Sequence, residues 1–213
     1  MLLSGGLAAM LSGCGLFGVG STYRYKMTVE VETPDGLKSG SAVREVSYVK
    51  QWIKLPDMAG VVATQRGEAV AVDLPGGQVL FALLSTNGYE VLQAAFGDDS
   101  SETLDAARSN RRIVELKPKP GSIPEQSGYP MLVRFRDMSD PMGVEGVKPD
   151  DLAASYGPGV RLRRMTVQMT DEPVTNGISK RLEWLNQIDR FRADPTNPFT
   201  NKLPNEISRL KDR

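Results

Sequence analysis

The 213-residue sequence contains no histidine and only one cysteine, Cys14. Without histidine the chain has no Ser-His-Asp triad, no Cys-His dyad and no histidine-ligated zinc, and a single cysteine forms no internal disulfide. The chain also lacks net charge, because 26 Lys and Arg balance 26 Asp and Glu. A general nucleic-acid-binding protein usually has a strong basic excess, so we expect no nucleic-acid partner.

The composition that is present is typical of a globular protein. Hydrophobic residues make up 40% of the chain and charged residues 24%, which is apolar enough for a core and too apolar for a disordered chain. The length suggests one domain, or two at most. We expect a single domain over residues 22–193, followed by a Pro- and Asn-rich tail over residues 194–213 that carries a short charged helix.

Strict alternation of apolar and polar residues begins at Thr22. It predicts a half-buried, antiparallel strand, with one face formed by Tyr23, Tyr25, Met27, Val29 and Val31. The segment Thr33-Pro34-Asp35-Gly36 has the residues of a tight turn, so a second strand over 38–49 is expected to return beside the first. A similar hairpin is expected around Pro75-Gly76-Gly77.

Further strands are expected over residues 112–117, 131–136 and 160–170, and short helices over 102–109 and after Lys148. Residues 89–96 suit a helix, although Asn87-Gly88 before them also fits a tight hairpin turn. The apolar spacing of Leu182, Leu185 and Ile188 predicts a longer helix over residues 179–191. The sequence therefore indicates an α+β fold: a mainly antiparallel sheet, a few short helices and one longer C-terminal helix.

The N-terminal segment has the features of a secretory signal. Residues 1–17 carry no charged side chain, and the apolar stretch Leu2 to Leu11 is too short to span a bilayer as a permanent helix. It leads directly into Leu11-Ser12-Gly13-Cys14. A buried or unstructured cysteine after an apolar start is the alternative interpretation.

The four residues Leu11-Ser12-Gly13-Cys14 resemble the lipobox of bacterial lipoproteins. The resemblance implies a signal peptide over residues 1–13, a palmitate-bearing lipid on Cys14 and a flexible tether over residues 14–21. Gly15 after the modified cysteine, where retained lipoproteins have aspartate, implies the outer membrane, facing the periplasm. The rest of the chain is similar to uncharacterised proteobacterial exported lipoproteins. This similarity rests on residues that include Tyr23-Arg24-Tyr25 and the run Phe135 to Pro141, and it implies no known activity.

Four arginines are the clearest candidates for a ligand site. Arg134 and Arg136 share one face of a predicted strand, and Arg161 and Arg163 share a face of another. If these strands pair, four guanidinium groups form an anion-binding patch for phosphate, carboxylate or a lipid headgroup. The alternative is a solvated sheet face with acidic neighbours.

The acidic residues suggest no catalytic or metal centre. Asp98, Asp99 and Glu102 lack the ligand spacing of an EF-hand loop and are expected to cap a helix. A second group is expected in turns and caps: Asp137, Asp140, Asp150 and Asp151. We expect no cofactor, no metal and no catalytic residue.

The resulting functional hypothesis is a lipid-anchored envelope protein with a binding or structural role. It has the membrane as a partner through its lipid, and an envelope protein or an anionic ligand as a second partner. Two alternatives stay open: a histidine-free hydrolase or transferase using Ser/Lys or paired carboxylates, and a small periplasmic inhibitor or immunity-like protein.

Overall fold

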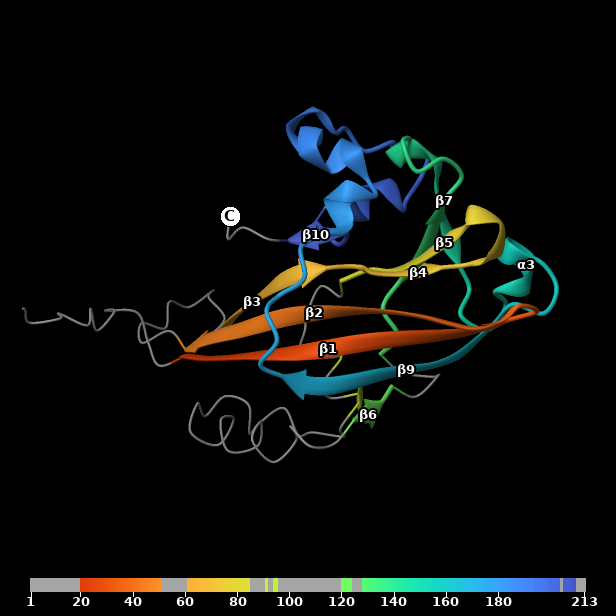
Figure 1. The fold of residues 1–213 in the computed structure, drawn as a ribbon. Coiled ribbons are helices and arrows are strands. Elements are labelled where there is room, and N and C mark those ends of the chain that lie inside the picture. Colours follow the sequence, from red (N-terminus) through yellow and green to blue (C-terminus); the bar gives the residue numbers. More distant parts are fainter. Residues whose placement is uncertain are drawn as a thin grey trace, which may run out of the picture.

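The computed structural model contains two antiparallel β-sheets and a layer of short 3₁₀ turns (Figure 1). It describes residues 20–50, 61–84, 91, 94–95, 120–123, 128–203 and 205–209. The first sheet has six strands in the order β10-β3-β2-β1-β9-β6, and the second has four in the order β4-β5-β7-β8. The prediction of a mainly antiparallel sheet is confirmed, although there are two sheets rather than one.

The first sheet contains β1 (Gly20–Thr33), β2 (Gly36–Lys50), β3 (Val61–Glu68), β6 (Gly121–Ser122), β9 (Arg161–Thr170) and β10 (Ser208–Arg209). The second contains β4 (Val70–Asp73), β5 (Val79–Ala82), β7 (Leu132–Phe135) and β8 (Val144–Val147). The one α-helix whose bounds are described is α3 (Ala153–Tyr156), and the 3₁₀ turns are η1 (Pro75–Gly77), η2 (Pro141–Gly143), η3 (Ile178–Lys180), η4 (Glu183–Arg190) and η5 (Thr200–Lys202).

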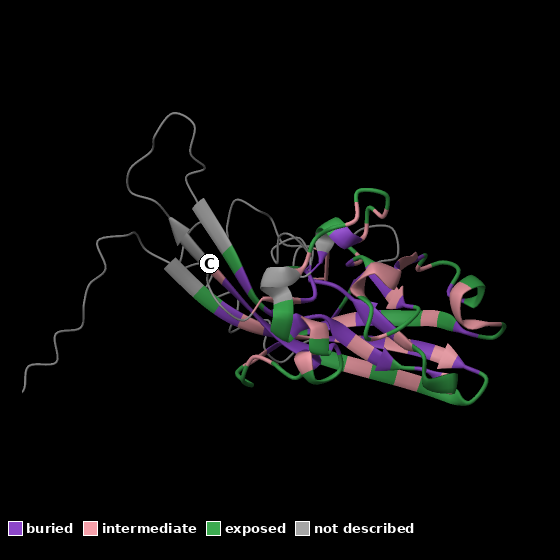
Figure 2. Cartoon of the chain, turned by 90° about the horizontal axis from the view of Figure 1, so that it is seen from above, coloured by how far each residue is buried: buried purple, intermediate pink, exposed green. Residues whose placement is uncertain are grey.

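The β1–β2 hairpin forms where its turn residues predict it. Pro34 and Asp35 connect the strands, Gly36 takes a φ of 101°, and the Thr33 hydroxyl donates to the Gly36 carbonyl at 2.8 Å. Gly36 suits this conformation because it has no Cβ. All five apolar residues on the predicted inner face of β1 are buried, and from Tyr23 to Val31 buried residues alternate with half-buried ones (Figure 2).

The second sheet is covered on both faces. One face packs on the first sheet through side chains that include Val72, Leu80 and Leu132. The other face, which includes Phe81 and Val133, packs under the 3₁₀ layer through Leu182 and other apolar residues. Burial on both faces explains why the second-sheet strands are mainly apolar, with Asp73, Arg134 and Glu145 as their only charged residues. The molecule therefore has three layers.

The chain passes from the first sheet to the second between β3 and β4, and Arg44 lies under this crossing. Gly67 has a φ of 137°, and a Cβ on it would lie 3.0 Å from the Arg44 Cγ atom. Arg44 is fully buried and donates to the carbonyl oxygens of Glu68, Ala82 and Leu83 at 3.1, 2.9 and 3.2 Å. Its guanidinium therefore links β2 to the chain crossing and to the end of β5.

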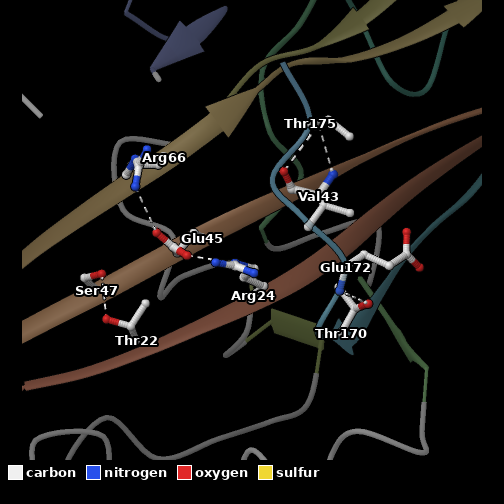
Figure 3. Close-up of polar contacts among 9 residues, drawn as sticks. All are labelled: Thr22, Arg24, Val43, Glu45, Ser47, Arg66, Thr170, Glu172 and Thr175. Carbon is white, nitrogen blue, oxygen red and sulfur yellow. Dashed lines mark hydrogen bonds and ion pairs between the residues drawn. The ribbon is translucent and has the colours of Figure 1, made fainter. Parts of the chain in front are cut away.

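A segment after β9 crosses the outer face of the first sheet and uses the strand edge that β3 leaves free (Figures 1 and 3). The pairing of β2 with β3 ends at Glu45 and Arg66. Beyond it, the Thr175 amide donates to the Val43 carbonyl at 3.2 Å, and the Val43 amide donates to the Thr175 hydroxyl at 3.2 Å. Thr175 thus satisfies the main-chain groups of Val43 on the side that β3 does not reach.

The predicted helix over residues 179–191 is wrong, and the described residues contain no long helix. This region forms η3 and η4, whose hydrogen bonds include Arg181 to Ile178 and Leu185 to Leu182, and whose backbone departs from helical geometry at Gln187. A 3₁₀ turn has about three residues per turn, so Leu182 and Leu185 face the same way. Both are buried against the second sheet.

The predicted boundary after residue 193 does not separate a tail from the core. Leu203 and Ile207 are buried, and Ile207 accepts a main-chain hydrogen bond from Ala69 at 2.8 Å. The charged helix expected in this segment is also wrong for its described part, where residues 205–207 form a turn and lead into β10. At the other end, β1 begins at Gly20, inside the expected tether.

Several other predictions can be compared with the structure. The hairpin around Pro75-Gly76-Gly77 is confirmed as β4 and β5, the strands over 131–136 and 160–170 as β7 and β9, and Val91, Ala94 and Ala95 are helical as expected for residues 89–96. The helix expected after Lys148 is the single turn α3. The expected helix over 102–109 and strand over 112–117, like residues 1–19, lie outside the described residues.

Candidate functional site

A hollow of about 340 Å³ lies at the end of the molecule where the β4–β5 turn, the end of β7 and α3 meet. We call it the arginine hollow. Its lining is formed by Gly76, Gly77, Gln78, Val79, Arg134, Phe135, Arg136, Met138 and Tyr156. The volume is near the lower end of the range of about 300–1,000 Å³ that small-molecule sites span.

Arg134 and Arg136 share a single carboxylate at this hollow. Glu145 lies opposite Arg134 in the pairing of β7 with β8. One carboxylate oxygen accepts from Arg134 Nε at 2.8 Å, and the other accepts from Arg136 Nε. These hydrogen bonds, from Arg136 first and then from Arg134, hold the pKa of the Glu145 carboxyl below its usual range. Two positive charges and one negative charge therefore leave the group net positive.

The two arginines differ in how much of their hydrogen-bonding capacity is used. Arg134 also donates to the Ser155 carbonyl, and its guanidinium carbon lies 5.9 Å from the centre of the Tyr156 ring. Arg136 bonds only through Nε among the described contacts, and its side chain is 73% exposed against 31% for Arg134. Arg134 is therefore fixed in place, and Arg136 has both terminal nitrogens available to a ligand.

The remaining lining combines apolar surface with one amide. Val79, Phe135 and Met138 supply apolar surface, and the Tyr156 hydroxyl donates to the Val79 carbonyl at 3.2 Å. Burial raises the pKa of the Tyr156 phenol, so the phenol stays protonated at neutral pH. Gln78 is exposed at the rim. Such a surface suits a small anion attached to an apolar or ring-shaped body.

The second predicted arginine pair lies on the other sheet. Arg161 and Arg163 belong to β9 in the first sheet, whereas Arg134 and Arg136 belong to β7 in the second, so the two strands do not pair. Arg161 donates to Glu32 at 2.6 Å, and Arg163 lies 3.5 Å from Glu32. The condition for a four-arginine patch is therefore not met.

The outer face of the first sheet also carries charge pairs (Figure 3). Glu45 on β2 lies between Arg24 on β1, at 2.7 Å, and Arg66 on β3, at 3.4 Å. Lys26 pairs with Glu172 of the crossing segment at 3.1 Å. These groups lie across neighbouring strands on an open face and contribute about 0–1 kcal/mol each. Such cross-strand pairs on an open sheet face are not by themselves a ligand site.

The acidic residues behave as turns and caps where they are described. Asp137 accepts from the Ser139 amide, Asp140 from the Met142 amide and Asp151 from the Ala154 amide, at 2.8, 2.9 and 3.1 Å. Their role as turn and cap residues is confirmed. Within the part of the chain that the structure describes, no three acidic or cysteine side chains gather as metal ligands. Asp98, Asp99 and Glu102 lie outside it.

Sequence reasoning missed Gln78 and Tyr156 as lining residues of the hollow, and Glu145 as the partner of its two arginines. Glu145 lies on β8, a strand with too little alternation to recognise. Gln78 and Tyr156 come from separate turns, and nothing in a single sequence says that these turns meet. Arg44 did leave a signal, because the register set by the β1–β2 turn places it opposite Tyr25 on the buried face.

Comparisons with family models, curated proteins and solved structures found no match to the chain. Cys14 lies outside the described residues, and among those residues no helix is long and apolar enough to span a membrane. The geometry of the arginine hollow is therefore the main structural observation that bears on function.

Proposed function

We propose that this chain is a lipid-anchored cell-envelope protein that binds an anionic ligand in the arginine hollow. The observation that carries the binding role is the pair Arg134 and Arg136, which share the single carboxylate of Glu145 and leave the Arg136 terminal nitrogens open to solvent. A guanidinium offers paired donors that match a carboxylate or a phosphate.

The position of the hollow fits a protein anchored at its N-terminus. β1 begins at Gly20, next to the expected lipid attachment, and ends at the turn beside α3 (Figure 1). Its 14 residues, at about 3.3 Å each, span about 46 Å. A lipid on Cys14 therefore leaves the hollow at the far end of the longest hairpin, where it is able to meet a ligand away from the anchoring membrane.

The anchor is tested by growing bacteria that express the chain with labelled palmitate. We expect label on the wild-type chain and none on Cys14→Ser, because the Cys14 thiol is the expected attachment point of the lipid. Each buried methylene of the attached acyl chains would contribute about 0.8 kcal/mol to membrane binding. Label retained by the variant contradicts the anchor.

Anion binding is tested by NMR on the full chain in mild detergent. Phosphate or acetate, added at constant ionic strength against chloride, is expected to shift the Arg136 Nε–H resonance. Arg136→Gln should weaken binding about tenfold, since a hydrogen bond to a charged group contributes about 1.5–3 kcal/mol. Arg161→Gln is the matched control, because Arg161 is 76% exposed and also bonded to one glutamate. Equal weakening by both variants contradicts the proposal.

Neither the hydrolase nor the inhibitor hypothesis gains a specific observation from the described residues. The arginine hollow is lined by two arginines that share the carboxylate of Glu145, which matches binding of an anion more closely than acid–base chemistry.

A further inference from the structure

A second hollow, of about 200 Å³, adjoins the arginine hollow. Gln78 and Tyr156 line both hollows, and we call the two neighbouring hollows together the groove. The second hollow is enclosed by the β1–β2 turn, the β4–β5 turn and the loop between α3 and β9. Its lining residues include three prolines, Pro34, Pro75 and Pro158.

The two ends of this groove carry opposite charge. At one end Arg136 has its terminal nitrogens available, as described above. At the other end Asp35 lines the second hollow, is exposed, and has no ion-pair partner among the described residues. A second anionic group is therefore disfavoured near Asp35, whereas a hydroxyl group able to donate to its carboxylate is favoured.

We infer that the groove binds an acidic oligosaccharide, with a carboxylate of one sugar at Arg136 and an uncharged sugar ring in the second hollow. This inference rests on the proposed anion-binding function and names its ligand class. A sugar ring has an apolar C–H face that can pack on proline rings, and hydroxyl groups that can donate to Asp35 or exchange hydrogen bonds with Gln78. The lining of the second hollow offers both kinds of surface.

The strand pairing argues against an extended peptide as the occupant. Peptides of this kind commonly bind by adding a strand to an open sheet edge. Near the groove, the open edge between β5 and β7 is short. Their pairing covers Phe81 with Val133 and Ala82 with Leu132, and the Val79 carbonyl beyond it already accepts from the Tyr156 hydroxyl. The second hollow is lined mainly by turns and the ends of strands, which offer no row of main-chain partners.

The test measures dissociation constants of four probes for the full chain in mild detergent: glucuronate, a hyaluronan tetrasaccharide, neutral chitotetraose and tetraglutamate. We expect the tetrasaccharide to bind at least tenfold more tightly than glucuronate. Asp35→Ala should remove this gain and leave glucuronate binding unchanged, whereas Arg136→Gln should weaken both. Asp150→Ala, another exposed turn aspartate outside both hollows, is the matched control and should change neither. Asp35→Asn, which preserves the turn preference, separates loss of the carboxylate from loss of the turn.

The outcomes separate the two proposals. Equal affinity for glucuronate and the tetrasaccharide, or tighter binding of tetraglutamate, overturns the oligosaccharide inference while Arg136-dependent glucuronate binding still supports the anion site. Binding of chitotetraose that is as tight as that of the tetrasaccharide and insensitive to Arg136→Gln overturns both. No binding of either glucuronate or the tetrasaccharide also overturns both.

Discussion

Replacing Arg44 tests the main polar link between the two sheets. The guanidinium is fully buried and reaches three carbonyl oxygens and the Met27 sulfur, the latter at 3.4 Å. Burial lowers the Arg44 pKa, and the neighbouring Tyr25 opposes this effect. The perturbation is Arg44→Met, which keeps the length and apolar stem of the side chain but removes every donor.

The expected cost follows from two opposing contributions. Three hydrogen bonds from a charged donor are worth about 1.5–3 kcal/mol each, so their loss costs about 5–9 kcal/mol before compensation. Removing a buried charge recovers several kcal/mol of desolvation. The net loss in the free energy of unfolding should therefore be about 2–4 kcal/mol, a large part of the 5–15 kcal/mol that stabilises an ordinary domain.

Urea unfolding measures this loss, with Arg66→Met as the control. Arg66 lies on β3, and its side chain is 44% exposed and 3.4 Å from Glu45, so its replacement should cost less than about 1 kcal/mol. Arg44→Lys should fall between the wild type and Arg44→Met, because an ammonium keeps the charge but does not reproduce the fork of a guanidinium. An Arg44→Met protein as stable as the wild type refutes the reasoning, since it means that the buried carbonyls do not need the guanidinium.

Three further predictions concern packing and pH. Gly40→Ala should destabilise the protein by at least about 2 kcal/mol in urea, because its Cβ would overlap the Ala71 carbonyl oxygen; Gly177→Ala, which meets nothing within 4 Å, should be nearly neutral. Ile207→Ala should cost about 2–5 kcal/mol, as expected for a fully buried side chain, and a loss below about 0.5 kcal/mol contradicts its place in the core. Because the pKa of Glu145 is depressed in the folded protein, its ionised carboxylate stabilises the fold. This contribution is complete above the unfolded pKa of about 4.3 and is lost as the pH falls through the lower folded pKa. As the pH is lowered from 7 to 3, the urea midpoint should therefore fall less steeply for Glu145→Gln than for the wild type. Identical slopes contradict the pairing of Glu145 with Arg134 and Arg136.

The hairpins were predictable because short-range chemistry determines them. Pro34 and Gly36 favour the turn of the first hairpin, and Gly76 and Gly77 both take a φ of 73° in the second. Alternation along β1 then marks the buried face, as the burial of Tyr25 and its apolar neighbours confirms. None of these features depends on a residue distant in sequence.

The longer helix was mispredicted because the same apolar residues fit two periods. Leu182 and Leu185 are three apart, which suits both an α-helix and a 3₁₀ turn. Packing against the second sheet selects the 3₁₀ turn. The sequence predicts no strand over β3, since Gly67 near its end and Pro56 before it are typical of loops.

The candidate site was only half accessible to sequence reasoning. That Arg134 and Arg136 share a face follows from the period of a strand, and both line the hollow. Their separation from Arg161 depends on which sheet each strand joins: the chain crosses between the sheets near Gly67, and β7 and β9 then pair in different sheets. A single sequence carries no local signal for this crossing.

The sequence by itself therefore determined the two hairpins, the buried face of β1, the absence of histidine chemistry and the paired arginines of β7, because each depends on neighbouring residues or on composition. Only the tertiary structure decided that the strands divide into two sheets, that residues after 193 complete the core, and that three separate turns enclose one groove. These outcomes depend on burial between segments far apart in the chain, where the free energy comes from surfaces that meet only after folding.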